Sequence, residues 1–294
     1  MPDIPLGRAD YHRTIPREAR VQTRNRFFEQ NPVLSENLAA LISRPGLRRW
    51  LSVGPGPIRG VYSQPGSFGD DLFVVSGDEL YRITSAGVAT FIANGLAMRG
   101  YVSMAATGNI GETPEYLFLA DGRNLWVYDA TGAGSFDAVV TPEDVGVISV
   151  GYIASYVVVI PAQGEGINGR FFWIEPGEKT LDPLNFATAE RAPDPVYSVV
   201  VFGDQFWLPG SSTTEVWYFT GVIDAPVARL QGVTFDRGTW EGTAIQVKES
   251  MVIVDRDGGV FQIAGGLNRI SNPSIEERIR RAIARQAARV VLGA

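Results

Sequence analysis

The chain contains no cysteine, and its single histidine is His12. Without cysteine, the protein can form neither disulfides nor thiol nucleophiles, and it lacks the Cys/His ligand sets of structural zinc sites. A Ser-His-Asp triad would have to use His12, which lies in a polar arm, so the sequence argues against a serine hydrolase. Composition thus excludes thiol catalysis and Cys/His zinc sites. From the motifs discussed below we nominate no catalytic residue, no metal ligand and no cofactor.

Long apolar runs are also missing from the sequence. No stretch of about 18 apolar residues occurs, which is the length that a membrane-spanning helix requires, and residues 1–13 lack the apolar core of a signal peptide. We therefore expect no membrane-spanning segment. A chain of 294 residues with 45% hydrophobic residues can still bury a full core, as one large all-β domain or two smaller ones.

Lysine is scarce, because all of the 26 cationic side chains except Lys179 and Lys248 are arginines. Arginine suits planar, bidentate contacts at interfaces, although a coding bias in a GC-rich genome would produce the same preference. Residues 1–49 carry nine Arg and five acids, and residues 275–294 carry five Arg and two Glu. The total is −6, so the body between them carries −13. An acidic body argues against a surface that grips nucleic acid, because phosphate binding needs a basic face.

Residues 1–30 are polar and rich in arginine, with no visible period, which is typical of an extended arm or a solvated tail. As an arm, this segment would dock onto a neighbouring subunit through Arg–carboxylate pairs. The candidate partner-binding residues are Arg13, Arg17, Arg20, Arg24 and Arg26. Residues 31–43 predict a short helix that Ser35 caps, with Leu38, Leu41 and Ile42 on one side.

From residue 60 onward, hairpins recur at a loose period. The clearest stretch, residues 195–221, predicts strands at 196–201, 205–208 and 214–219, and its last strand reads as packed on both faces. Similar hairpins are predicted at residues 72–83, 115–129, 155–175 and 251–266, with weaker strands at 100–105, 146–152 and 243–248. Equivalent positions lie 44, 40, 49 and 46 residues apart, at Phe73, Leu117, Val157, Phe206 and Val252.

A period of 40–50 residues with three or four strands in each unit is the signature of propeller blades. The fold predicted is therefore all-β, a β-propeller-like array of antiparallel hairpin blades, of which five are visible. A β-sandwich or two small barrels are the structural alternatives. Residues 272–294 predict one helix, which Asn272 or Ser274 can cap and whose first turn accommodates Pro273. We divide the chain into an N-terminal arm with a short helix (1–49), a propeller domain (50–271) and a C-terminal helix (272–294).

Four patterns resemble functional motifs, but each favours an ordinary structural role. Residues 164–169 match G-x-G-x-x-G, yet a strand follows instead of the helix that a dinucleotide site requires. Asp255 and Asp257 resemble a calcium loop without its distal glutamate, so a tight turn is favoured. Residues 234–240 resemble the Asp-box of sialidase-type propellers, with one residue missing between Gly238 and Thr239.

Acidic pairs are the fourth pattern, and they are candidates for acid/base catalysis in principle. They occur at Asp70-Asp71, Asp78-Glu79 and Glu276-Glu277. Acids at turns and in the first turn of a helix have an ordinary structural role. The sequence therefore nominates no pair as catalytic.

The order of several short segments resembles one known family. Arg-Pro-Gly-Leu at residues 44–47 follows an Asn-rich turn, and Arg59-Gly60-Val61 precedes Gly-Asp-Glu-Leu-Tyr at 77–81. Residues 209–221 and 271–280 match two later segments, the second at the start of the helix. The order is similar to that of the packaged-DNA stabilisation proteins of short-tailed bacteriophages, which form the tail hub or plug.

This resemblance implies a structural virion protein without enzymatic activity, assembled in the host cytoplasm and located in the tail. It implies a hexameric ring that retains packaged DNA and contacts an adaptor or portal-side ring, a needle and tail fibre or tailspike proteins. Viral DNA would pass through without sequence-specific binding, and an acidic channel wall would let it slide. Longer members continue past the helix, and six blades are expected in them. The alternative is a free-standing β-propeller that binds or hydrolyses glycans.

Overall fold

The computed structural model describes residues 26–30, 39–98, 100–108, 115–131, 133–164, 166–222 and 226–292. The chain forms two compact units. The first comprises Met1–Trp50, Asp257–Gly259 and Ile270–Ala294, and the second comprises Leu51–Arg256 and Val260–Arg269. Among the described residues, no helix has the length and hydropathy needed to cross a bilayer.

The second unit contains five four-stranded antiparallel sheets, in each of which every strand pairs with the next strand of the chain. Blade 1 comprises β3 (Ile58–Tyr62), β4 (Leu72–Ser76), β5 (Glu79–Ile83) and β6 (Ala89–Ala93). Blade 2 comprises β7 (Ser103–Ala106), β8 (Tyr116–Ala120), β9 (Leu125–Asp129) and β10 (Ser135–Val139). Blade 3 comprises β11 (Val147–Ile153), β12 (Tyr156–Pro161), β13 (Arg170–Ile174) and β14 (Phe186–Thr188).

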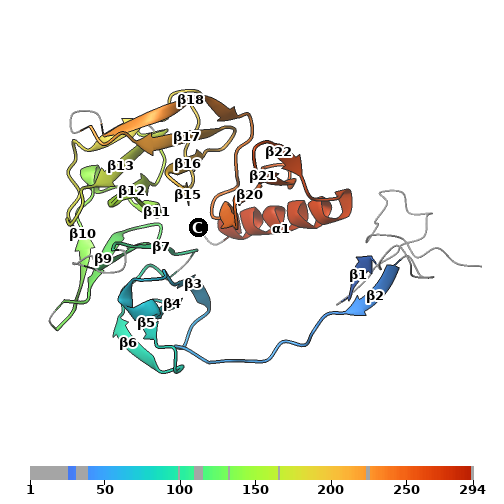
Figure 1. Ribbon diagram of the computed structural model, residues 1–294, viewed down its shortest axis with the longest axis horizontal. Coiled ribbons are helices and arrows are strands. Elements are labelled where there is room, and N and C mark those ends of the chain that lie inside the picture. Colours follow the sequence, from blue (N-terminus) through green and yellow to red (C-terminus); the bar gives the residue numbers. More distant parts are fainter. Residues whose placement is uncertain are drawn as a thin grey trace, which may run out of the picture. The chain divides into compact units, whose positions relative to one another are not determined.

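The last two sheets are blades 4 and 5. Blade 4 comprises β15 (Val200–Phe202), β16 (Gln205–Pro209), β17 (Thr214–Phe219) and β18 (Val227–Phe235). Blade 5 comprises β19 (Ile245–Val247), β20 (Ser250–Val254), β21 (Val260–Ile263) and β22 (Leu267–Arg269). Two 3-10 helices, η1 (Phe68–Asp70) and η2 (Pro142–Asp144), lie in connections. The five blades follow one another around a centre, and the first strand of each is the inner one (Figure 1).

The predicted propeller is confirmed, and so is the repeat on which it rested. The five marker residues lie in β4, β8, β12, β16 and β20, the second strand of each blade. The inner strand of blade 4 is the main departure, because it spans Val200–Phe202 instead of residues 196–201. Val196 instead makes an isolated bridge with Gly210.

Four hydrophobic clusters fill the spaces between consecutive blades, because the second and third strands of the middle blades carry apolar residues on both faces. In β8, Leu117 packs toward blade 1 and Phe118 packs toward blade 3. In β17, Val216 packs toward blade 5 and Trp217 toward blade 3, so the strand predicted to be packed on both faces is confirmed. Blades of this kind read as continuous apolar runs because neither face meets water.

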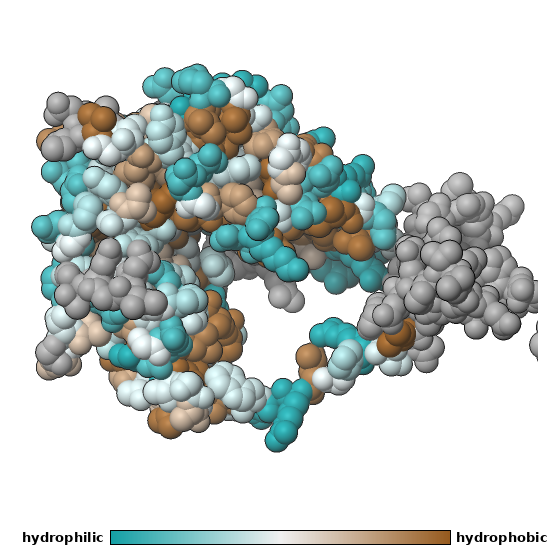
Figure 2. All heavy atoms as spheres, in the orientation of Figure 1, coloured by the Kyte–Doolittle hydropathy of each residue, from teal (hydrophilic) through white to brown (hydrophobic). Residues whose placement is uncertain are grey.

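Among the described residues, no fifth cluster joins blade 5 to blade 1, and each of these blades keeps apolar residues exposed. On blade 1, Val61 is 57% exposed and Phe91 is 50% exposed. On blade 5, Ile245 of the inner strand is 53% exposed. The space-filling view shows hydrophobic residues on the surface formed by blade 1 (Figure 2).

The first unit contains a hairpin and a helix. Strand β1 (Arg26–Gln30) pairs antiparallel with β2 (Ala39–Ser43), and Arg26 lies opposite Ser43. The short helix expected over residues 31–43 is therefore wrong for 39–43, and residues 31–38 lie outside the described part. A helix of about two turns gains too few hydrogen bonds to offset its nucleation, whereas each residue of Ala39–Ser43 lies opposite a residue of β1.

Helix α1 (Pro273–Leu292) begins as the sequence predicts. The side chain of Asn272 accepts the backbone N–H of Ile275 at 3.0 Å, which caps the first turn. Glu277 pairs with Arg281 at 2.8 Å, four residues further along the helix. Such pairs add only a few tenths of a kcal/mol each to an exposed helix.

Candidate functional site

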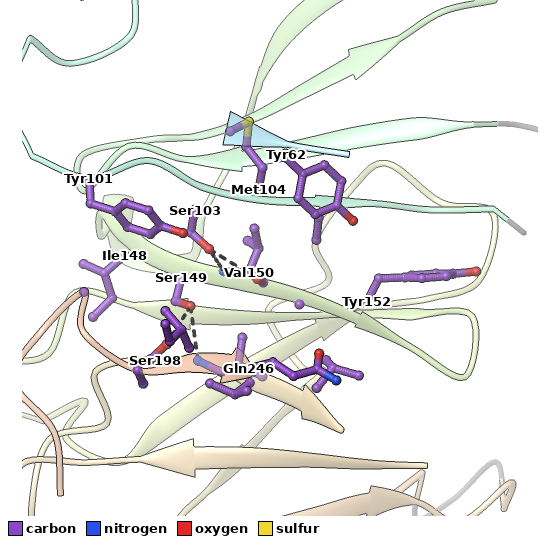
Figure 3. Close-up of a pocket in the computed structure, with 18 of the residues that line it drawn as sticks. Tyr62, Tyr101, Ser103, Met104, Ile148, Ser149, Val150, Tyr152, Ser198 and Gln246 are labelled. Carbon is purple, nitrogen blue, oxygen red and sulfur yellow. Dashed lines mark hydrogen bonds between the residues drawn. The ribbon is translucent and has the colours of Figure 1, made fainter. Parts of the chain in front are cut away.

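The inner strands of all five blades surround one central cavity of about 420 Å³. Its lining includes Tyr62 from blade 1, Ser103 from blade 2, Ser149 from blade 3, Ser198 from the segment before β15 and Gln246 from blade 5. Figure 3 shows these side chains around the cavity, together with Tyr101 and Tyr152. The described lining carries hydroxyl, amide and aromatic groups, and none of its residues is an acid, a lysine or an arginine.

Two serines of this lining join neighbouring blades. The hydroxyl of Ser103 accepts the backbone N–H of Val150 at 3.1 Å, and that of Ser149 accepts the N–H of Val199 at 3.1 Å. Val102 donates its N–H to the carbonyl oxygen of Arg59 at 3.1 Å. Hydrogen bonds thus link the inner parts of blades 1 to 4 in sequence. The oxygens of Ser103 and Ser149 therefore have a structural role.

Two tyrosines at the cavity are kept neutral. Burial raises the pKa of Tyr62 above the ordinary value, although the N–H of Ala106, 2.9 Å from its oxygen, partly opposes this. Burial also raises the pKa of Tyr101. The Tyr62 hydroxyl donates to Gln64 Oε1 at 2.5 Å. With neutral phenols and no carboxylate pair in its described lining, the cavity can receive a small neutral group but offers no acid/base couple.

The candidate arginines of the arm fall mostly outside the described part of the chain. Arg13, Arg17, Arg20 and Arg24 lie outside the described residues. Arg26 is the first residue of β1, where its backbone is described. Whether these residues bind a partner stays a prediction.

The glycine motif at residues 164–169 lies in the loop between β12 and β13. Gly169 has a φ of 76° and is followed at once by strand β13. Its close contact is the carbonyl oxygen of Ala189, 2.8 Å from where a Cβ would stand. The predicted hairpin loop is confirmed, because a strand and not a helix follows the motif.

The acidic turn at Asp255 and Asp257 connects β20 to β21, as the sequence predicts. Asp255 accepts a hydrogen bond from Arg237 Nη1 at 3.3 Å. Among the described residues, no group of three or more acidic or histidine side chains could hold a metal ion.

The Asp-box-like segment connects blade 4 to blade 5. Asp236 pairs with Arg191 at 3.0 Å, and the N–H of Thr239 donates to the carbonyl oxygen of Gly210 at 2.8 Å. A Cβ on Gly238 would stand 2.3 Å from that same oxygen. The segment therefore needs glycine at this point because the two backbones approach so closely.

The acidic pairs have structural partners. Asp71 pairs with Arg82 at 2.7 Å, and Glu79 accepts the Tyr81 hydroxyl at 2.5 Å. Glu276 is buried and accepts the Ser271 hydroxyl at 2.6 Å. Charges at turns and helix starts commonly serve such local bonds.

Two buried carboxylates that the sequence analysis did not single out hold the connections between blades. Asp121 accepts the N–H of Ala97, in the connection from blade 1 to blade 2, at 2.8 Å, and the indole N–H of Trp126 at 2.8 Å. Glu215 accepts the N–H of Arg191, in the connection from blade 3 to blade 4, at 2.7 Å, and the indole N–H of Trp217 at 3.0 Å. An acid shortly before a tryptophan in a blade's hairpin is the sequence signal for this arrangement.

The charge of Asp121 is stabilised despite its burial. Burial by itself raises the pKa of this carboxyl, but the N–H groups of Ala97, Asn124, Trp126 and Arg123 together hold the pKa below its ordinary value. A carboxylate that accepts several N–H bonds is favoured in its charged form.

Arg59 and Gly60, part of the pattern that resembled a phage family, also have structural roles. The Arg59 guanidinium donates to the carbonyl oxygens of Gly77 at 2.7 Å, Gly100 at 2.8 Å and Ala97. A Cβ on Gly60 would stand 2.8 Å from the backbone carbonyl oxygen of Val102, so the chain leading into blade 2 leaves no room for a side chain. This pair therefore fastens the hairpin turn of blade 1 to the start of blade 2.

Comparison with solved structures finds similar folds at low sequence identity. The virginiamycin B lyase of Staphylococcus aureus matches with a TM-score of 0.50 and 10% identity, over 74% of this chain and 70% of that one. The WD40 domain of Pan2 from Neurospora crassa matches at 0.45 and 12% identity, over 80% and 70%. At such identities the first likeness concerns the fold alone, and the second carries no weight.

Comparison with curated protein sequences gives no significant match. A family model described as "Bacteriophage P22 Gp10, beta-propeller" does match, and it covers residues 7–294. Because the match spans nearly the whole sequence, and because the five-bladed fold agrees with it, the chain belongs to this family of bacteriophage β-propeller proteins that stabilise packaged DNA.

Proposed function

We propose that the chain is a subunit of a hexameric tail hub, or plug, beneath the portal and adaptor of a short-tailed phage. The hub retains packaged DNA and connects the adaptor to the needle and the tail fibres. It assembles in the host cytoplasm and becomes part of the virion tail. The observation that carries this proposal is the family match over residues 7–294.

The geometry supports a role in assembly. The serine oxygens of the central lining bind the backbones of neighbouring blades, and the candidate motifs at 164–169 and 234–240 form loops and blade connections. A rigid body of this kind suits a protein that acts by being positioned among partners. Its proposed partners are copies of itself, the adaptor or portal-side ring, and the needle, fibre or tailspike proteins.

In this proposal, DNA passes through the middle of the ring of subunits without sequence-specific binding. The cavity within one propeller is about 420 Å³, within the range of small-molecule pockets, and is therefore not the DNA channel. An acidic wall is expected for the DNA channel of the ring, whereas the described lining of this cavity is uncharged. The acidic body, which carries −13 between residues 50 and 274, would instead repel phosphate along the axis of the ring.

The arginine-rich arm is proposed to dock onto a neighbouring subunit. Residues 1–49 carry a net charge of +4 beside a body that carries −13. Arg–carboxylate pairs formed by Arg13, Arg17, Arg20, Arg24 and Arg26 would add geometric specificity as well as attraction.

The glycan alternative rests on one observation, the tyrosine and hydroxyl lining of the cavity. A propeller that hydrolyses glycans would need a pocket that is both aromatic and acidic, and the described lining contains no carboxylate. Glycoside hydrolysis ordinarily uses a pair of carboxylates, so only binding of a neutral sugar remains compatible with this cavity.

Light scattering coupled to size exclusion separates the two functions. The chain should form a closed ring of six copies, alone or when mixed with the adaptor ring of the same phage. Labelled duplex DNA at low salt should bind only weakly, because few phosphates are neutralised. A protein that stays monomeric beside the adaptor and retains a sugar on an affinity column would contradict the proposal.

A further inference from the structure

Strand β6 (Ala89–Ala93) is the outer strand of blade 1 and differs from the other outer strands of the propeller. Among the strands that the structure describes it pairs with β5 alone, so its other edge has no described strand beside it. Its sequence, Ala-Thr-Phe-Ile-Ala, contains neither charge nor proline, and its first three residues are exposed. Natural sheets commonly protect an edge with charge, short length or a bulge.

The other outer strands carry such protection. Strand β10 contains Asp137, and β18 contains Arg229. Strand β14 has three residues, and β22 has three that include Arg269. Strand β6 has only an irregularity between the pairs Leu80–Ala93 and Tyr81–Phe91, which leaves Ala89–Phe91 in regular register. The free edge of β6 is therefore the one described outer edge of five or more residues without a charge.

Space for side chains lies next to this edge. A groove of about 510 Å³ runs between the outer strands of blades 1 and 2. It is lined in part by Thr90, Phe91, Tyr128 and Phe136, and the Asp71–Arg82 ion pair lies in it. A strand that added to β6 could place alternate side chains in this groove, as in other cases of strand addition.

The charges near β6 indicate which segment of a second copy could pair with its free edge. The turns next to β4 of blade 1 carry Asp70, Asp71 and Asp78, and β5 begins with Glu79. Among the described residues, Asp71 pairs with Arg82 and Asp78 interacts electrostatically with Arg59. The arm of residues 1–49 carries nine arginines and a net charge of +4. An acidic rim with an open, apolar strand edge therefore complements a basic arm that contains a strand.

The hairpin of that arm is itself incomplete. Strands β1 and β2 have five residues each and form a two-stranded sheet. A two-stranded hairpin is marginally stable at best in water, and a third strand is normally needed. Pairing with β6 of another copy would provide that strand.

We propose that the free edge of β6 accepts the β1–β2 hairpin of a second copy of this chain, so that subunits are joined by arm exchange. This deepens the arm contact of the proposed function and rests on it. A strand of the hairpin adds backbone hydrogen bonds along Ala89–Phe91, and the net charge of +4 on residues 1–49 is attracted to the carboxylates of blade 1.

Two variants of the full chain test the edge. Thr90→Lys places a charge on the exposed edge of β6 and also repels a basic arm, whereas Gln231→Lys adds the same charge to an exposed position of β18. Thr90→Lys should raise the concentration for half-assembly by about ten-fold or more, equivalent to roughly 1.4 kcal/mol. Gln231→Lys should assemble like the wild type. Circular dichroism checks that both variants are folded.

Hydrogen–deuterium exchange of the wild type provides a measurement that needs no variant. The amides of residues 88–93 should exchange at least about ten-fold more slowly in the assembled ring than in the monomer, while those of β18 should change little. One outcome would contradict arm exchange: the wild type and Thr90→Lys form rings equally well, and residues 88–93 gain no protection. The proposed hub function would not be affected by that outcome. If the amides of Ala89–Phe91 that do not bond to β5 are already protected in the monomer, a second copy is not the occupant. A wild type that never forms rings, even with the adaptor, overturns the proposed function itself.

Discussion

The interface between blades 3 and 4 and the face of blade 5 that points away from blade 4 are built from the same kind of sheet, yet they differ in what covers them. At the first, Phe171 is fully buried and meets the ring of Trp217 edge-on at a centroid distance of 5.1 Å. On blade 5, Ile253 faces blade 4 and is buried, but Ile245 on the inner strand is 53% exposed. Apolar burial therefore stabilises the contacts between consecutive blades, whereas blades 1 and 5 each bury only one face.

The largest expected effect comes from opening a cavity between blades 3 and 4. Phe171→Ala should lower the free energy of unfolding by about 3–5 kcal/mol, because a fully buried ring is lost and its neighbours close in only partly. Urea titration followed by tryptophan fluorescence measures the change. A loss below about 1 kcal/mol would show that this interface does not carry the fold.

A smaller effect is expected where a buried carboxylate holds a connection between blades. Asp121→Asn should lower the free energy of unfolding at pH 7 by about 2–3 kcal/mol, because bonds from N–H groups to a charged acceptor are lost. Asp137→Asn, at an exposed position of β10, is the matched control and should change stability by less than about 0.5 kcal/mol.

The pH dependence follows from the lowered pKa of Asp121. Its stabilisation is complete above the ordinary carboxyl pKa of about 4, and it disappears as the pH falls through the lower folded-state value. The wild type should therefore lose more stability than Asp121→Asn between pH 7 and acid pH. Parallel pH profiles for the two proteins would mean that the charge of Asp121 contributes nothing.

The smallest effect is expected on the face of blade 5 that points away from blade 4. Ile245→Ala should cost less than about 1 kcal/mol, because its side chain remains half in water. Ile253→Ala, the same substitution on the buried face of the same blade, should cost about 2–5 kcal/mol. Thermal unfolding of the two variants compares them directly. Equal losses of stability in the two variants would mean that the face carrying Ile245 is also covered in solution.

The sequence predicted the parts of this fold that depend on strong local signals. The second strands marked by Phe73, Leu117, Val157, Phe206 and Val252 are buried apolar runs next to glycine turns, and these signals sufficed for the blades. The cap at Asn272 was predictable for the same reason. Strand β2 was not, because residues 39–43 suit a helix locally and become a strand only by pairing with β1.

The central cavity was beyond the reach of sequence reasoning. Its lining residues come from short inner strands some 40–50 residues apart, and nothing in the neighbourhood of Ser103 or Ser149 distinguishes them from surface serines. The carboxylate at Asp121 resembled that at Asp255, since each lies in a turn with glycine. Apart from Trp126, which follows Asp121, the two turns look alike in sequence, and the fold shows that Asp121 accepts four N–H groups and Asp255 an arginine.

Electron cryo-microscopy of the tail of mature virions tests the central claim most directly, that this propeller acts as an assembled part of the phage particle. The account predicts six copies of the five-bladed unit around the DNA axis, between adaptor and needle, with every propeller cavity away from that axis. A tail without this chain, or one in which DNA passes through the centre of a single propeller, would contradict it.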